Sequence, residues 1–152
     1  MQNRKIESRI ETELEVKSYL QNLRYALDNN AKVEFQVERM VDRKRDEKYT
    51  NKYTVADLFP DLNPTEAVIQ EIRTLSVEEY MRTIKDSRFP KRSEMREFGR
   101  LYIGKGDVYI KIRVELLSSF GNHTTFVMSF HYAERPFGLG DFPYRGPGGD
   151  WV

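Results

Sequence analysis

The chain has 152 residues and a nearly balanced charge, with 25 Lys and Arg against 24 Asp and Glu, which favours one domain with a single core. It contains no cysteine and two histidines, which excludes disulfides and thiolate metal sites and argues against a histidine-rich zinc centre. No apolar run approaches the length of a membrane span, and no apolar segment follows the basic residues at the N-terminus, so we expect a cytoplasmic domain over residues 1–152 with no cofactor and no membrane contact.

The first third of the chain predicts a helix, then a strand, then a loop. Apolar residues recur at mostly helical spacing in RKIESRIETELEVKSYLQNLRYALDNN, which predicts one long amphipathic helix that ends near DNN. They are Ile6, Ile10, Leu14, Leu20, Leu23 and Leu27. Alternation of Val33, Phe35 and Val37 with polar residues predicts a strand with one solvated face. The charged run DRKRDEKYTNKYT has no periodicity and predicts a loop.

Three helix-start signals follow, in the stretches TVAD, NPTE and SVEE. They begin at Thr54, Asn63 and Ser76, and the last two fit the capping pattern of a polar residue with Glu three positions later. We therefore expect short consecutive helices near 64–74 and 77–85. The basic stretch DSRFPKRSE after them predicts a loop.

The last part of the chain changes to strand patterns. EMREFGRLYI, DVYIKIRVELL and TTFVMSFHY predict three strands, and GKGD and SSFGNH predict the two hairpin turns between them. The segment from about 138 to 152 is rich in Gly and Pro and predicts a flexible tail. The order of elements predicts an α+β fold, with the N-terminal and central helices packed on a mostly antiparallel, strongly twisted sheet.

Strand alternation predicts which side chains of this antiparallel meander share a face. The expected core face holds Leu101, Ile103, Val108, Ile110, Ile112, Val114, Phe126, Met128 and Phe130. The expected open face holds Arg96, Phe98, Arg100, Tyr102, Tyr109, Lys111, Arg113, Thr125, Val127, Ser129 and His131. A bulge at Gly99 would shift the first of these strands.

A local surplus of positive charge coincides with this expected open face. Between Arg82 and Arg113 there are ten Lys or Arg against four acids. Clustered positive charge is the pattern that binds polyanions, so the face is a candidate for phosphate-rich ligands. The alternative is an ordinary solvated outer face of a sheet.

The same face carries groups that could cleave RNA without a metal. Such cleavage needs a base for the 2′-hydroxyl, an acid for the leaving 5′-oxygen, and cations for the charge on the phosphate. His131 is the natural acid or base, because the unperturbed pKa of histidine is about 6.5. Arg82, Arg96 and Lys111 could supply the positive charge. Tyr109 could orient the 2′-hydroxyl, or transfer a proton if nearby cations lower its pKa.

From about residue 55 to 144 the chain resembles the MqsR-like toxins, which are messenger-cleaving ribonucleases of bacterial toxin–antitoxin modules with a RelE-like fold. IQEIRTLSVEEYMRT is similar to the helix pair of that family, and GDVYIKIRV to its G-x-x-Y-I/L-K-I strand. FVMSFHYAERPF and FPYR resemble the V-x-S-F-H-x-A-E-x-P-L and P-Y endings of its branch from Gram-positive bacteria. The order and spacing of these motifs agree over most of the chain.

This resemblance implies catalytic roles for Arg82, Arg96, Tyr109 and His131. Where the family can have Lys, this chain has Arg82 and His131, and where some members have Gln it has Arg96. These departures keep the positive charge or the capacity for proton transfer, and they leave the RNA sequence preference open.

For the surrounding surface we expect RNA contacts from Arg100, Lys111 and Arg113. The resemblance further implies that single-stranded messenger RNA is the substrate, that cleavage needs no metal, and that a cognate antitoxin neutralises the protein.

Two other functions fit the same residues. One is a non-catalytic module on this scaffold that binds RNA or the ribosome. The other is a protein-interaction domain whose basic face docks an acidic partner.

Overall fold

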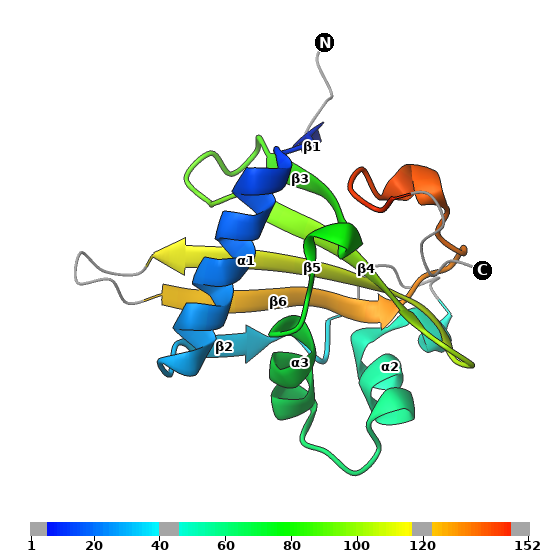
Figure 1. Ribbon diagram of the computed structural model, residues 1–152. Coiled ribbons are helices and arrows are strands. Elements are labelled where there is room, and N and C mark those ends of the chain that lie inside the picture. The colour runs from blue at the N-terminus through cyan, green and yellow to red at the C-terminus, as the bar shows by residue number, and fades with distance from the viewer. Residues whose placement is uncertain (1–5, 40–45, 117–122, 147–152) are drawn as a thin grey trace.

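Figure 1 shows a computed structural model of the chain, which describes residues 6–39, 46–116 and 123–146. Six strands form one open, mostly antiparallel sheet in the order β1-β3-β4-β5-β6-β2. The strands are β1 Ile6–Arg9, β2 Lys32–Phe35, β3 Tyr80–Asp86, β4 Met95–Tyr102, β5 Gly106–Leu116 and β6 His123–Tyr132. The helices are α1 Glu13–Asp28, α2 Asn51–Leu58 and α3 Pro64–Ile72.

The α+β class and the antiparallel meander expected from the sequence are confirmed. Helix α1 crosses one face of the sheet, and α2 and α3 gather near the edge formed by β2 (Figure 1). None of the helices in the described ranges is long and apolar enough to cross a membrane.

The predicted N-terminal helix is divided into a strand and a shorter helix. Residues Ile6–Arg9 form β1, which pairs antiparallel with β3. A capping box starts α1, because Thr12 Oγ1 accepts from the Glu15 amide at 3.1 Å and Glu15 Oε1 accepts from the Thr12 amide at 2.8 Å. The buried stripe of α1 consists of Val16, Leu20 and Leu23. One helix over the whole segment was therefore a wrong prediction, and Ile6, Ile10 and Leu14 are exposed.

Helix α3 begins as expected, with Asn63 Oδ1 accepting from the Glu66 amide at 3.1 Å. Helix α2 begins inside the predicted loop, where Thr50 Oγ1 caps it by accepting from the Tyr53 amide at 3.2 Å. The start signal at Thr54 therefore lies within this helix, one turn after its N-cap at Thr50.

The helix predicted near 77–85 is a strand. Only Val77–Glu79 forms one 3₁₀ turn, in which the Ser76 amide donates to Glu79 Oε1 at 2.9 Å. From Tyr80 onward the chain is β3, which pairs with β1 on one side and β4 on the other. The capping signal starts this one turn and no more. The backbone N–H and C=O groups of the residues after it form hydrogen bonds with the two neighbouring strands.

The register of the central strands reverses the face expected for β4. Phe98, Ile110 and Phe130 are Cα partners across β4, β5 and β6, and all three are fully buried. Leu101 is 36% exposed and Ile103 is 91% exposed, so neither is a core residue. Pairing is continuous through Gly99, without a bulge there. Consequently Arg96, Arg100 and Tyr102 share the helix-covered face with Phe98, and Glu97 and Gly99 lie on the opposite face.

A register shift in β6 corrects the expected faces of that strand. Lys111 pairs with Ser129 whereas Ile112 pairs with Val127, so Met128 is an extra residue in the ladder. The shift puts Thr125 and Val127 in the core, where both are buried, and leaves Ser129 and His131 on the face of Lys111 and Tyr109. The same shift moves Phe126 out of the expected core, opposite Arg113.

Helix α2 completes the outer edge of β6. Strand β2 pairs in parallel with Thr124–Val127 and then ends. Beyond it, Asn51 Nδ2 donates to the Met128 carbonyl at 3.1 Å, and Asn51 Oδ1 accepts from the Phe130 amide at 2.9 Å. Thr54 Oγ1 accepts from the Tyr132 amide at 2.9 Å. Two buried side chains of a helix thus replace a strand partner along the last part of β6.

Part of the predicted flexible tail packs on the sheet, and residues 147–152 lie outside the described ranges. Phe142 is buried, and its ring meets Phe137 edge-on at 5.7 Å between centroids. A Cβ on Gly99 would lie 2.7 Å from Phe137 and 2.9 Å from Phe142, so these rings occupy the space above Gly99. The Tyr144 hydroxyl donates to the Glu11 carbonyl. The predicted turn SSFGNH also falls mostly outside the described residues.

A buried carboxylate joins the start of α1 to the sheet. Glu11 Oε2 accepts from Arg96 Nε at 2.9 Å and from Thr83 Oγ1 at 2.5 Å, and the Glu11 amide donates to the Tyr80 hydroxyl at 3.0 Å. The Arg96 guanidinium also lies 4.3 Å from the Tyr19 ring centroid. Burial raises the pKa of Glu11, but the hydrogen bonds from Arg96 and Thr83 lower it by more, so the pKa lies below its usual value.

Replacing this carboxylate should destabilise the fold in a pH-dependent way. Glu11→Gln removes the carboxylate that is hydrogen-bonded to Arg96 and leaves only Glu94, 4.0 Å away, so we expect the free energy of unfolding at pH 7 to fall by about 3 kcal/mol. Because the folded-state pKa is lowered, ionised Glu11 stabilises the protein above its unfolded pKa, and this is lost as pH falls through the folded pKa. The gap between wild type and variant should therefore narrow in acid.

Urea unfolding of both proteins at pH 7 and at pH 3 measures this gap. Glu13→Gln is the matched control, because Glu13 is half exposed and pairs with Lys17 on the surface. Equal stability of the Glu11 and Glu13 variants at pH 7 would contradict the structural role of Glu11.

Candidate functional site

Four adjacent strands each bring one polar side chain to the face opposite α1. Arg82 comes from β3, Glu97 from β4, Tyr109 from β5 and His131 from β6. Arg82 pairs with Glu97, and Tyr109 pairs with His131, in the register of the sheet. We name these four residues the four-strand cluster.

Glu97 is the centre of the four-strand cluster. Its side chain is 5% exposed, and both of its oxygens accept hydrogen bonds. Arg82 Nε donates to Oε1 at 2.5 Å, and the Tyr109 hydroxyl donates to Oε2. The hydrogen bond and charge of Glu97 raise the pKa of Arg82. The Arg82 side chain is 50% exposed, so it can meet a ligand while it is bound to the carboxylate.

Tyr109 stays a neutral phenol at physiological pH. Burial raises its pKa most, and the neighbouring Glu97 carboxylate raises it further. Arg82 and Arg39 lower it by less. The condition under which Tyr109 was expected to transfer a proton, a pKa lowered by nearby cations, is therefore not met. Tyr109 can donate its proton to Glu97 and accept one from a ligand, but it does not act as a phenolate.

His131 lies beside Tyr109 and is almost covered. The ring centroids are 5.4 Å apart at an interplanar angle of 41°, and His131 is 8% exposed. Its Nδ1 lies 2.9 Å from the Tyr132 carbonyl oxygen. A carbonyl oxygen can only accept, so Nδ1 carries the hydrogen and Nε2 is the nitrogen that can exchange a proton.

Further basic side chains continue along the same face. Lys111 stands between Glu97 and Ser129 in the sheet register. Two residues further on β5, the Arg113 guanidinium lies 4.4 Å from the Phe126 ring centroid. Arg39, which follows β2, donates from Nη1 to Ser129 Oγ at 3.1 Å. The cluster therefore lies within a row of positive charge.

Two predicted site residues are not part of this face. Arg96 is bound to Glu11 beneath α1. The Arg100 side chain is 15% exposed, and it donates to Glu79 Oε2 at 2.8 Å and to the Thr74 carbonyl at 2.9 Å. Arg100 thus ties the end of α3 and the turn after it to β4. Both arginines were assigned to the wrong face because Leu101, rather than Phe98, was taken as the core residue of β4.

Sequence reasoning missed Glu97 and Arg39. Glu97 could have been found, since it precedes Phe98, the large aromatic residue in the middle of its strand, and therefore lies on the other face. Arg39 carries no periodic signal, because it lies just after β2 ends at Phe35.

The chemistry of the arrangement follows from these contacts. A phenol donates a hydrogen bond to a carboxylate, an imidazole nitrogen can take or give a proton, and a half-exposed guanidinium is held next to them. Among the described residues, no group of three or more His, Cys, Asp or Glu is arranged to hold a metal ion.

A comparison with known proteins finds no family model, no curated protein and no solved structure that matches this chain.

Proposed function

We propose that the protein is an endoribonuclease that cuts single-stranded messenger RNA at the four-strand cluster, without a metal ion. The observation that carries this proposal is the shared hydrogen-bonding of Glu97 with Tyr109 and Arg82, next to the His131 ring. This combines a proton acceptor, a second proton-transfer group and a fixed positive charge, which are the three requirements of metal-free RNA cleavage.

In the proposed reaction, the 2′-hydroxyl donates its proton to the Tyr109 oxygen while the Tyr109 proton passes to Glu97. The 2′-oxygen forms a bond to phosphorus, and the bond from phosphorus to the 5′-oxygen breaks. The imidazolium of His131 gives the proton on Nε2 to this leaving oxygen. Arg82 and Lys111 offset the charge that builds on the phosphate. The products are a 2′,3′-cyclic phosphate and a 5′-hydroxyl.

The resemblance to the MqsR-like toxins supports the same function. Arg82, Tyr109 and His131 were named by that resemblance, and all three belong to the cluster. Within the proposal the scaffold is RelE-like. Arg96, which was expected to supply positive charge, is bound beneath α1 and has no role in the proposal. Its neighbour Glu97 takes a different role, as proton acceptor.

One observation favours a second candidate function, a non-catalytic module that binds RNA or the ribosome. The Glu97 side chain is 5% exposed and His131 is 8% exposed, so a bound RNA has limited access to both unless side chains move. Such a module would use Arg82, Lys111 and Arg113 for phosphates and would leave the RNA intact.

Cleavage in the presence of a chelator tests the proposed function. We expect wild-type protein incubated with single-stranded RNA and EDTA to release products that end in a 2′,3′-cyclic phosphate. His131→Ala and Glu97→Gln should each lower kcat by about a hundredfold to ten-thousandfold, because each removes a proton-transfer step. Lys52→Gln is the control, since Lys52 is exposed and pairs with Glu38. RNA binding without any cleavage would instead support the non-catalytic module.

The salt dependence of RNA binding separates phosphate contacts from charges that are only solvated. For single strands, the slope of log K against log salt is about −0.7 for each phosphate neutralised. Lys111→Gln should make this slope shallower by about 0.7. Lys17→Gln on α1 should leave it unchanged, because α1 covers the opposite face. Equal slopes for wild type and the Lys111 variant would remove Lys111 from the binding surface.

A cognate antitoxin is the partner that the proposal implies, in the cytoplasm of a bacterial cell. Expression of this chain alone should arrest growth of a bacterial host, and co-expression of a protein encoded beside it should restore growth. His131→Ala expressed to the same soluble level should not arrest growth. Unhindered growth with abundant soluble wild-type protein would contradict the toxin role.

A further inference from the structure

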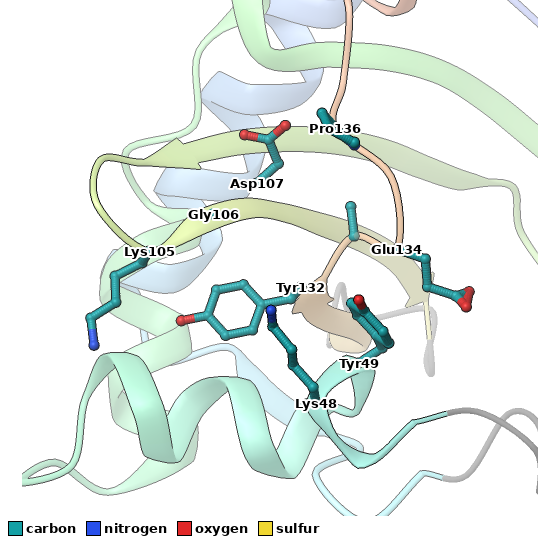
Figure 2. A pocket seen from close by; sticks show the side chains of 9 residues that line it. Lys48, Tyr49, Lys105, Gly106, Asp107, Tyr132, Glu134 and Pro136 are labelled. Atoms are coloured by element: carbon teal, nitrogen blue, oxygen red, sulfur yellow. The ribbon is translucent and has the colours of Figure 1, made fainter.

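A pocket of about 300 Å³ lies at the end of β6, outside the four-strand cluster. Its walls come from the 3₁₀ turn before α2, the turn between β4 and β5, and the segment that follows β6 (Figure 2). This volume is at the lower end of the range for small-ligand sites in proteins.

The pocket combines aromatic rings with two ammonium groups. Figure 2 shows Lys48 and Lys105 on either side of the Tyr132 ring, with Tyr49 at the wall beside Lys48. Lys48 Nζ lies 5.8 Å from the centroid of the Tyr49 ring. Tyr132 is 3% exposed, so Tyr49 is the ring of this pair that a ligand can stack on. A ring that can stack, with cations beside it, is a feature with which proteins bind unpaired nucleotides.

Hydrogen bonds hold the floor of the pocket in place. The Tyr132 hydroxyl donates to Asp57 Oδ2 at 2.6 Å, and Lys105 Nζ lies 3.7 Å from the same oxygen. Asp107 Oδ2 accepts from the Phe137 amide at 2.8 Å, which fixes the segment after β6. The shape of the pocket is therefore largely preformed, and binding needs little reorganisation of this floor.

The pocket adjoins the four-strand cluster along the sheet. Ala133 follows His131 by two residues, and Asp107 precedes Tyr109 by two, which is about 7 Å along each strand. The Ala133 amide donates to the Asp107 carbonyl at 2.8 Å, so the pairing of β5 with β6 continues to the pocket. The Tyr132 ring points to the helix-covered face, because Tyr132 pairs with the buried Val108. A chain bound across the cluster would therefore pass around the end of β5 and β6 to place its next nucleotide in the pocket.

We propose that this pocket is a nucleotide subsite that takes the unpaired base next to the cleaved bond. The base stacks on the Tyr49 ring, and Lys48 and Lys105 bind its phosphate. The proposal rests on the proposed function in that the ligand is part of an RNA chain. A phosphate alone fits less well, because it has no base to stack on Tyr49, and Asp107 and Glu134 in the lining offset the charge of the two lysines.

Binding of mononucleotides tests the subsite without catalysis. Titration of the wild-type protein with each of the four nucleoside 5′-monophosphates should give saturable binding of at least one of them. Lys48→Gln, Lys105→Gln and Tyr49→Leu should each raise its Kd by about tenfold, from the loss of a charge contact or of base stacking. Lys52→Gln should leave the Kd unchanged, since Lys52 pairs with Glu38 outside the pocket. Inorganic phosphate should bind more weakly than the nucleotide.

The outcomes distinguish this inference from the proposed function. Nucleotide binding that depends on the pocket, in a protein that does not cut RNA, supports the subsite and overturns the nuclease. RNA cleavage whose KM is unchanged in all three pocket variants, without mononucleotide binding, overturns the subsite and leaves the nuclease standing. Phosphate binding as tight as nucleotide binding overturns base recognition in the pocket. Because three independent side chains are tested, misfolding of one variant does not decide the result.

Discussion

The stacking of Phe98, Ile110 and Phe130 across three neighbouring strands determines where the other side chains of the meander lie. Since successive residues of a strand point to opposite faces, burying these three puts Tyr109 and Glu97 on the other face. A slip of one residue in either strand pair would exchange the two sets and bring charged groups into the core. The same apolar contact that stabilises the sheet therefore assembles the candidate site.

The extra residue Met128 and helix α2 together determine the position of His131. Because of this extra residue, the side chains of β6 after Met128 alternate between the faces in the opposite phase from those before it. His131 lies beside Tyr109 as a result. Asn51 and Thr54 then satisfy the backbone groups of this half where β2 no longer reaches. A strand end without these partners would fray, and the imidazole would lose its fixed relation to the phenol. Met128, Asn51 and Thr54 lie outside the four-strand cluster, and they nevertheless help to fix the position of its imidazole.

Local signals in the sequence predicted local structure well. The Asn63–Pro64 start of α3 and the strands of the meander needed only a few neighbouring residues to be recognised. Predictions failed where contacts between residues distant in sequence determine the structure. The local sequence at β3 favours a helix, and which face of β4 is buried depends on its pairing with β5. The candidate site was predicted in part for this reason. Tyr109 and His131 belong to strands with clear alternation, whereas Glu97 was hidden by an incorrect choice of core residue.

Both edge strands, β1 and β2, precede the four inner strands of the sheet in the sequence. Ile6 pairs with Asp86, and Lys32 pairs with Thr124. Contacts between residues so distant in sequence give a high contact order, which slows folding because long loops must close first. The ribosome releases the N-terminal part of the chain first, so β2 cannot pair until β6 has been synthesised. The four groups of the candidate site therefore come together only after synthesis has passed His131.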